Sequence, residues 1–153
     1  MRLLKGVLVA SFATLGLWVL PANAQSVTQA QVGALVEALR RAAPQTGQAN
    51  DGLYSDWKVK GENIPRWSRF CTGREMTPAQ FQANPQQARA IMNCIVEDLL
   101  KEEYAASRNN ERTAVLRSAA WWMTGDSTQY NNSAIAPYTQ RVLSFYEQER
   151  ARR

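Results

Sequence analysis

The sequence predicts a single all-α domain, a small irregular globule of several helices with one disulfide bond. Along several stretches, apolar residues recur at intervals of three and four, which is the spacing of one face of a helix. Helix-capping sequences precede three of these stretches, at Thr28, Thr77 and Asn84. Helices of this number and length, joined by loops that contain Trp and Pro, fit an irregular helical domain better than an extended bundle.

The N-terminal segment has the three parts of a secretory signal peptide. Two basic residues precede an apolar run over residues 6–20, and Ala22-Asn23-Ala24 supplies the small residues of a cleavage site. A retained membrane anchor is the weaker alternative, because the run is shorter than the ~20 residues that a spanning helix needs. We therefore expect residues 1–24 to be removed and residues 25–153 to form one exported domain, periplasmic or extracellular, with no membrane span after processing.

The first helix is expected at about residues 28–42. The sequence Thr28-Gln29-Ala30-Gln31 has the spacing of a capping box, and apolar residues then recur at helical intervals until Pro44 closes the segment. A polar loop follows over residues 45–52. Residues 53–60 alternate imperfectly, which is compatible with a short extended segment or a helical turn. We expect irregular structure there.

Four further helices are expected. A short one begins at Thr77, where the next residue is a Pro that fits the first helical position. A long amphipathic helix spans about residues 85–106, and its wide apolar face predicts a core element. Another runs over about 110–123 and stops at Gly125, and the last one opens at Pro137.

The two cysteines, Cys71 and Cys94, occur in a chain that we expect to be exported, so a disulfide bond between them is the economical assumption. Because Cys94 falls in the long helix, the bond would tie that helix to the loop that carries Cys71. The chain contains no histidine, which excludes a Ser-His-Asp site and leaves a thiol nucleophile without its usual base. No metal and no cofactor are expected, and hydrolytic chemistry must rest on carboxylates.

The charge balance is mildly positive, with 18 basic and 13 acidic residues. This excess suits a protein that works near an anionic polymer or a membrane surface. No nucleic-acid partner is expected, because the exported chain lacks a basic motif interleaved with aromatic residues. We expect the protein to be a monomer.

Four short motifs follow one another along the chain. They are Leu53-Tyr54-Ser55-Asp56-Trp57-Lys58-Val59-Lys60, Asn63-Ile64-Pro65-Arg66-Trp67-Ser68, Gly73-Arg74-Glu75-Met76-Thr77-Pro78-Ala79-Gln80-Phe81 and Ala119-Ala120-Trp121-Trp122-Met123-Thr124-Gly125-Asp126. In this order they resemble the part of lysozyme-like lytic transglycosylase domains that follows the catalytic residue. The resemblance covers roughly residues 32–146 and implies a lysozyme-like fold that acts on or binds peptidoglycan.

The resemblance also implies a catalytic acid near the end of the first helix. Glu37 is the only acidic residue of that helix, and the loop and Tyr54 follow it in the expected order. In the family, the glutamate protonates the glycosidic oxygen and then acts as base while the muramyl C6 hydroxyl attacks the anomeric carbon. Such an acid needs a raised pKa. Glu37 is the candidate catalytic residue, and Tyr54, Trp57 and Lys58 are the candidate substrate-binding residues.

Two departures from the family pattern support a second hypothesis. Ala38 stands where the family usually has Ser, and Lys58 stands where it has Gln. A Lys ammonium cannot accept a hydrogen bond, and near Glu37 it would lower the pKa of that carboxyl. The protein would then be a non-catalytic binding or assembly protein on a degenerate lysozyme-like scaffold, with glycan strands or an envelope protein as partner. From periodicity alone, Glu37 also fits a solvated glutamate on the polar side of a surface helix. A third reading of the chain is an unrelated helical secreted domain.

The aromatic residues divide into two expected groups. Trp67, Trp121 and Trp122 are expected in the core, because large aromatic side chains of a small domain usually fill its interior. Tyr54 and Trp57 are expected as cleft walls, where their rings could stack on sugars. Lys58, Arg66, Arg69 and Arg74 would add positive charge near the groove, although a solvated charged face is the better explanation for them.

Overall fold

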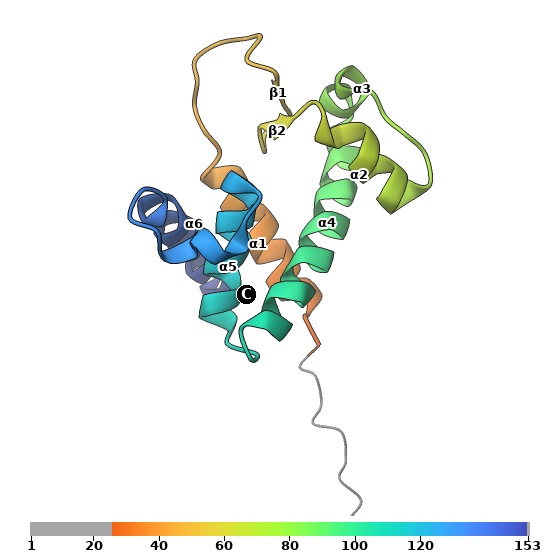
Figure 1. Ribbon diagram of the computed structural model, residues 1–153. Coiled ribbons are helices and arrows are strands. Elements are labelled where there is room, and N and C mark those ends of the chain that lie inside the picture. The colour runs from red at the N-terminus through yellow and green to blue at the C-terminus, as the bar shows by residue number, and fades with distance from the viewer. Residues whose placement is uncertain (1–25, 153) are drawn as a thin grey trace, which may run out of the picture.

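The computed structural model describes residues 26–152 and shows a mostly helical protein with one small two-stranded sheet (Figure 1). The expected signal peptide, residues 1–24, lies outside the described residues. The elements in chain order are α1 (Gln29–Arg41), β1 (Leu53–Tyr54), β2 (Val59–Lys60), α2 (Asn63–Thr72), α3 (Pro78–Ala83), α4 (Pro85–Ala106), α5 (Glu111–Thr124), the 3-10 helix η1 (Ser127–Asn131) and α6 (Ala136–Ala151). The predicted all-α class is therefore confirmed. Within the described part of the chain, no helix is both long and apolar enough to cross a membrane.

The caps that the sequence indicates are formed. Thr28 and Gln31 make a reciprocal capping box at the start of α1, in which the Thr28 Oγ1 accepts from the Gln31 N–H at 3.2 Å and the Gln31 Oε1 accepts from the Thr28 N–H at 2.8 Å. Thr77 repeats the arrangement ahead of α3, and the Asn84 side chain caps α4. Each cap satisfies backbone N–H groups that have no partner inside the helix.

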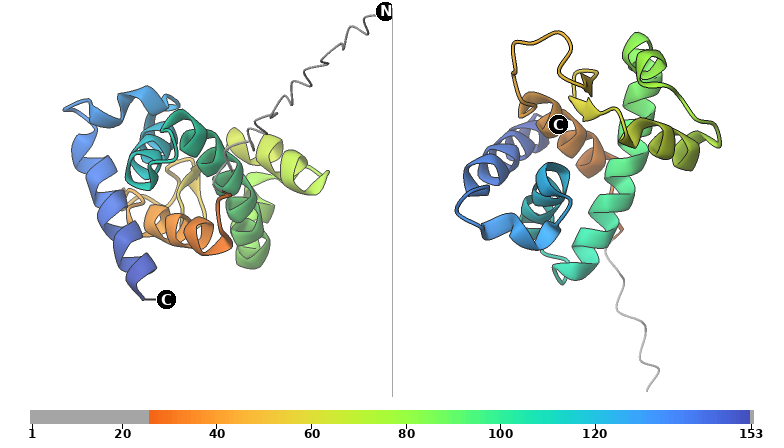
Figure 2. Two further views of the ribbon diagram at one scale, coloured as in Figure 1. Left: turned by 90° about the horizontal axis from the view of Figure 1, so that it is seen from below. Right: turned by 45° about the horizontal axis from the view of Figure 1, so that its top comes forward.

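Helix α1 forms the centre of the core. Its apolar residues Val32, Leu35, Val36 and Leu39 have no exposed surface. Helices α4 and α6 both pack against it, and α5 packs against α4 and α6 (Figure 2). The apolar residues of α1 that the sequence pattern indicates are thus covered by α4 and α6, which removes their surface from water.

The second part of the molecule lies around the N-terminal half of α4. There α2, α3 and the β1–β2 hairpin are grouped together, away from α5 and α6 (Figure 1). In the hairpin, Leu53 pairs with Lys60 and Tyr54 with Val59 in antiparallel register. Residues 53–60 were expected to be irregular, but the two ends of this segment are paired strands joined by a turn. Its turn uses positive φ angles at Ser55 and Lys58, 62° and 53°.

Helix α2 differs from the sequence expectation. Cys71 was expected in a loop, but it lies within this helix together with Pro65, Trp67 and Ser68, so that expectation is wrong. Pro65 is the third residue of α2, in the first turn, where a missing N–H removes no intrahelical bond. The helix ends at Gly73, which adopts the left-handed conformation at φ 74° and is a favourable terminator.

The predicted disulfide bond between Cys71 and Cys94 is present and joins α2 to α4. It closes a loop with a sequence separation of 23 residues, across two Cα atoms that lie 6.0 Å apart. A closed loop of this length restricts the unfolded chain and stabilises the fold by about 3 kcal/mol in the chain-entropy description.

The double substitution Cys71→Ala and Cys94→Ala is expected to lower the free energy of unfolding by about 3 kcal/mol. Urea unfolding followed by tryptophan fluorescence measures the change. The matched control is the unsubstituted protein in a reducing agent, which should lose a similar amount of stability. An unfolding midpoint equal to that of the oxidised protein would contradict the structural role of the bond.

A buried ion pair joins α4 to α5. The Arg117 Nε donates to the Glu103 Oε2 at 2.5 Å, and the Arg117 Nη2 donates to the Ser127 Oγ in η1 at 3.0 Å. The side chain of Glu103 is 4% exposed and that of Arg117 18%. This contact fixes the start of η1 against the helix that precedes it.

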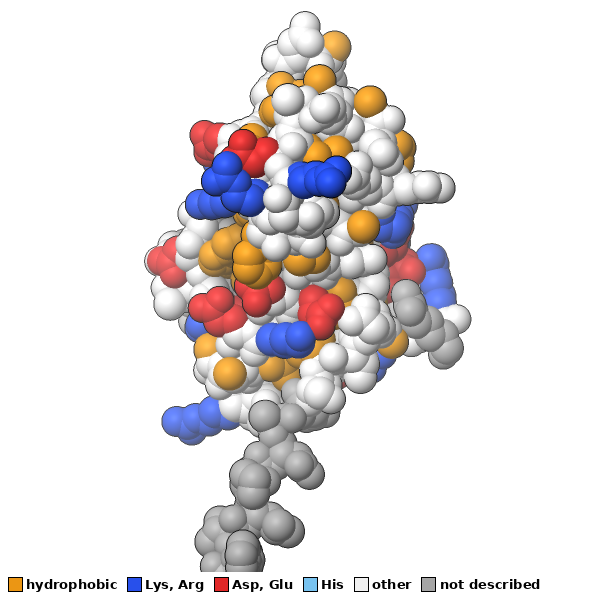
Figure 3. Space-filling view, turned by 90° about the vertical axis from the view of Figure 1, so that its right-hand side faces the viewer, with side chains coloured by type: hydrophobic (Ala, Val, Ile, Leu, Met, Phe, Trp, Pro, Cys, Tyr) orange, Lys and Arg blue, Asp and Glu red, His pale blue; other side chains and the backbone are white. Residues whose placement is uncertain are grey.

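Acidic and basic side chains are interspersed on the face of the molecule shown in Figure 3. On that face they lie in small mixed groups between hydrophobic and neutral side chains, and no large area of one sign is visible. Ion pairs across the structure are consistent with this mixing. The charge excess of the chain is therefore not gathered on this side.

Candidate functional site

A pocket of about 330 Å³ opens between the hairpin and α2 on one side and the C-terminal end of α5 on the other. We call it the tryptophan pocket. It is lined by Pro44, Leu53, Lys58, Val59, Lys60, Glu62, Asn63, Arg66, Trp67, Trp121, Trp122, Met123, Thr124, Gly125 and Tyr138. Its volume lies at the lower end of the ~300–1,000 Å³ of small-molecule sites, and its mixture of aromatic and polar residues is typical of such sites.

Three tryptophans form the apolar part of the pocket. The Trp67 ring stacks on Trp121 with centroids 6.3 Å apart and planes 24° from parallel, and its centroid is 5.5 Å from that of Trp122. Trp67 is buried, as expected from the sequence. Trp121 and Trp122 pack against the core but stay half-buried and line the pocket, so the expectation that they are core residues holds only in part.

The position of Trp121 and Trp122 follows from the end of α5. The helix stops at Gly125, whose φ is 80° and whose N–H donates to the Trp121 carbonyl at 2.7 Å. Gly is the residue that adopts this left-handed conformation at no steric cost. The two indoles therefore belong to the last turn of the helix, where they pack against the core on one side and remain partly exposed on the other. Their closeness to the helix-ending Gly125 was the signal in the sequence that could have placed them at a surface.

Polar side chains from the hairpin and from the start of α2 form the rim of the pocket. Lys60, Glu62 and Arg66 are exposed, and Lys58 and Asn63 are half-buried. Among the described residues, Glu62 contributes the only carboxylate of the lining. The rim therefore offers several hydrogen-bond donors beside an aromatic surface.

Lys58 is held in place by Asp51, in the loop before the hairpin. Its Nζ lies 3.4 Å from the Asp51 Oδ2. A hydrogen bond from the Thr46 hydroxyl and another from the Leu53 N–H lower the pKa of Asp51, so this partner carries its negative charge. Of the candidate substrate-binding residues, Lys58 is the one that the structure places in the pocket.

Trp57 and Tyr54 lie elsewhere. Trp57 is 3% exposed, and its indole N–H donates to the Val36 carbonyl at 2.8 Å, which ties the hairpin to α1. The Tyr54 ring lies against the backbone of Gly61, where an added Cβ would be 2.9 Å from the Tyr54 Cε2. Neither residue lines the tryptophan pocket. The expectation that they form cleft walls is not met at this pocket, because local spacing does not reveal which face of so short a hairpin is covered.

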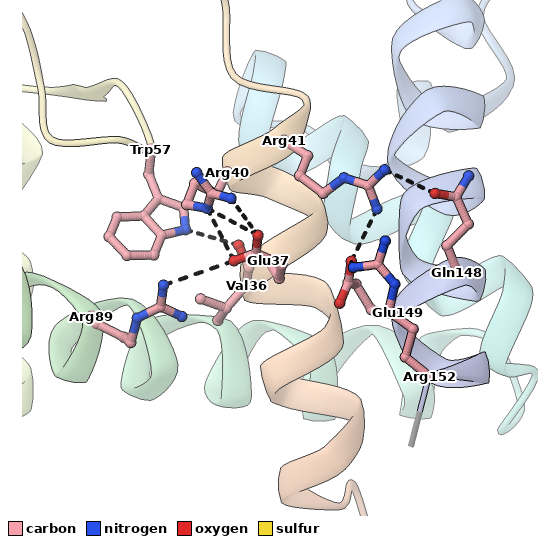
Figure 4. A network of polar contacts seen from close by, with 9 residues as sticks. All are labelled: Val36, Glu37, Arg40, Arg41, Trp57, Arg89, Gln148, Glu149 and Arg152. Carbon is pink, nitrogen blue, oxygen red and sulfur yellow. Dashed lines mark hydrogen bonds and ion pairs between the residues drawn. The ribbon is translucent and has the colours of Figure 1, made fainter.

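Glu37 is part of a network of arginines beneath Trp57 (Figure 4). The Arg40 Nε lies 3.0 Å from both carboxylate oxygens, and its Nη2 lies 2.5 Å from Oε1. The Arg89 Nη2 from α4 is 3.8 Å from Oε2, and the same guanidinium lies over the Trp57 ring, 5.1 Å from its centroid. Glu37 is 23% exposed and is not among the residues that line the pocket.

The electrostatic surroundings of Glu37 favour its charged form. The hydrogen bond from Arg40 lowers the pKa of this carboxyl, in opposition to the partial burial that raises it, and the charges of Arg40, Arg89 and Arg41 lower it further. A general acid needs the opposite shift. A nearby cation was expected to lower the pKa of Glu37, but this cation is Arg40, three residues away on the same helix, and not Lys58. An ion pair at this spacing could have been inferred from the sequence.

Replacing Glu37 by Gln is expected to cost about 0.5–1 kcal/mol of stability at neutral pH, the range of partly exposed ion pairs. Because folding lowers this pKa, the pair stabilises the folded state fully above the ordinary glutamate pKa of about 4.3, and this stabilisation is lost as the pH falls through the lowered value. Thermal unfolding of both proteins from pH 7 to pH 2.5 should show the difference in Tm shrinking toward zero. Glu102→Gln, at an exposed position, is the control and should show no such trend. A constant difference would contradict the pairing.

Among the described residues, no group of three or more Asp, Glu or Cys side chains is placed to hold a metal ion. Comparisons with family models, with curated proteins and with solved structures gave no match to this chain. The geometry of the pocket and of the Glu37 network is therefore the basis for a functional proposal.

Proposed function

We propose that this protein is exported and binds the glycan strands of peptidoglycan in the tryptophan pocket without cleaving them. The observation that carries the proposal is the cluster of Trp67, Trp121 and Trp122 around a pocket with a polar rim. Sugar rings have apolar faces that stack on indole, and their hydroxyl and amide groups need hydrogen-bond partners at the edges. Both kinds of contact are available within this one pocket.

The disulfide bond and the expected signal peptide support the location. A bond between Cys71 and Cys94 persists in an oxidising compartment, such as the periplasm or the cell exterior. Peptidoglycan is the glycan polymer of the bacterial envelope, and the resemblance to lysozyme-like domains points to this polymer. Its strands carry both sugars and peptide carboxylates, which suit the aromatic pocket and its basic rim.

The surroundings of Glu37 argue for binding without cleavage. The carboxyl is ion-paired with Arg40, its pKa is lowered, and it lies outside the tryptophan pocket. Glu62, at the rim, is exposed and lacks the apolar setting that a glycosidic acid needs. The second of the two hypotheses from the sequence therefore fits the geometry better than the first.

Incubation of the purified exported protein with cell-wall sacculi tests the proposal. The protein should sediment with the sacculi, and mass spectrometry should detect no anhydromuropeptides. Anhydromuropeptides that form with the wild type and disappear with Glu37→Gln would overturn the proposal in favour of the enzyme. A protein that neither sediments nor releases products would overturn the glycan proposal and turn attention to an envelope protein as the partner.

A further inference from the structure

The rim of the tryptophan pocket carries cations that are not all neutralised. Lys58 is paired with Asp51, at 3.4 Å. None of the ion pairs formed by the described residues includes Arg66, and its Nη2 donates to the Asn63 Oδ1 at 3.1 Å. Arg66 therefore keeps its full positive charge at the edge of the pocket, with donors left for a ligand.

Arg66 lies next to the aromatic surface of the pocket. It precedes Trp67 in α2, and both residues line the same pocket, Trp67 as a buried wall and Arg66 as an exposed side chain. Asn63, one turn earlier on the same helix, restricts the guanidinium through their hydrogen bond. A ligand stacked on the indoles would thus present its edge to a partly ordered guanidinium.

A guanidinium binds a carboxylate through two parallel N–H donors, a geometry that a neutral hydroxyl or amide does not match. Hydrogen bonds to a charged partner are also about twice as strong as those between neutral groups. Glu62 is the one acid of the described lining that would oppose such a ligand. Lys58 is already paired with Asp51, but Lys60 and Arg66 together outweigh the one charge of Glu62, so the rim has an excess of positive charge.

We infer that the tryptophan pocket selects sugars that bear a carboxylate and that Arg66 is the residue that binds this group. The inference rests on the proposed function and narrows its ligand class. In peptidoglycan the carboxylate has two sources, the lactyl group of a peptide-free muramic acid and the carboxylates of the attached peptide. The chemistry at Arg66 is the same for both.

The test compares matched ligands by calorimetry with the purified protein. The ligands are a disaccharide of N-acetylglucosamine and N-acetylmuramic acid with a free lactyl carboxylate, its neutral methylamide, and the same disaccharide carrying its peptide. The wild type should bind at least one carboxylate ligand about tenfold more tightly than the methylamide, as expected for one charge-assisted contact. Which carboxylate ligand shows the preference identifies the source of the group.

Two variants locate the preference. Arg66→Gln should bind the carboxylate ligands and the methylamide with equal affinity. Arg69→Gln is the control, because Arg69 lies on the same helix, is 69% exposed, is paired with Glu75 at 2.7 Å and is not in the lining, so it should keep the tenfold preference. Equal binding of all ligands by the wild type would overturn the inference while leaving glycan binding intact. Failure of every ligand to bind would overturn the proposed function and this inference with it.

Discussion

Replacement of Arg117 by Gln is expected to lower the free energy of unfolding by about 3 kcal/mol or more. The substitution leaves the Glu103 carboxylate, whose side chain is 4% exposed, without its partner at 2.5 Å. Removing one member of a buried pair costs about 3–5 kcal/mol, because the other charge stays desolvated. It also removes the hydrogen bond to Ser127, which fixes η1. Urea unfolding, followed by circular dichroism, measures the loss.

Arg112→Gln provides the matched control for this prediction. Arg112 lies on the same helix and pairs with Glu147 at 2.6 Å, but the two side chains are 61% and 55% exposed. Its loss should cost well under 1 kcal/mol, as for other surface pairs. The double substitution Glu103→Leu and Arg117→Met should recover much of the stability, because it leaves no buried charge. Equal losses for Arg117→Gln and Arg112→Gln would show that burial of the pair is not what makes it important.

Trp122→Ala is expected to weaken glycan binding by roughly thirtyfold, or about 2 kcal/mol, as for truncation of a central aromatic contact in a binding site. The indole is half-buried, lines the pocket and lies next to Trp67. Its loss removes a stacking surface that the rim cannot replace. Titration with the disaccharide of N-acetylglucosamine and N-acetylmuramic acid, followed by calorimetry, gives the dissociation constants.

Two controls separate this effect from a general disturbance of the fold. Trp122→Phe keeps an aromatic surface and should retain most of the affinity. Phe70→Ala removes an aromatic residue that is 64% exposed and lies on α2 outside the pocket, so its affinity should equal that of the wild type. A Trp122→Ala protein that is folded and binds as tightly as the wild type would rule out the pocket as the glycan site.

Most of the helices could be predicted because their signals are local. Thr28, Thr77 and Asn84 cap helices where the sequence indicates, and Gly125 ends α5. Each of these residues acts on backbone groups within a few positions of itself, so spacing along the chain is sufficient to recognise it. The disulfide bond was predictable for a different reason, since the chain has only two cysteines.

The segment from the hairpin to α2 was harder to predict. Each strand has two residues, which is too short for an alternating pattern to be recognised. In α2, Pro65 and Trp67 resemble a turn sequence, yet the Pro falls in the first helical turn, where it is tolerated. Tertiary packing against α4 and the bond at Cys71 then stabilise a helix of ten residues that the motif did not indicate.

The candidate site was predicted only in part, because it depends on contacts between distant residues. Lys58 was expected at a binding site and does line the tryptophan pocket. Trp57, in contrast, is buried and hydrogen-bonded to Val36, which is 21 residues away in the sequence. Glu37 interacts with a second cation, Arg89, which lies on another helix. The spacing of residues along one helix carries no information about such partners.

The most direct test of glycan binding in the tryptophan pocket is a nuclear magnetic resonance titration of the indole N–H signals. Protein labelled with ¹⁵N is titrated with the disaccharide of N-acetylglucosamine and N-acetylmuramic acid, and single Trp→Phe variants assign the signals. The signals of Trp121 and Trp122 should shift with saturable dependence on the ligand, while that of Trp57, bonded to the Val36 carbonyl, should stay in place. Shifts confined to Trp57, beside Glu37, or no shifts at all, would contradict the account.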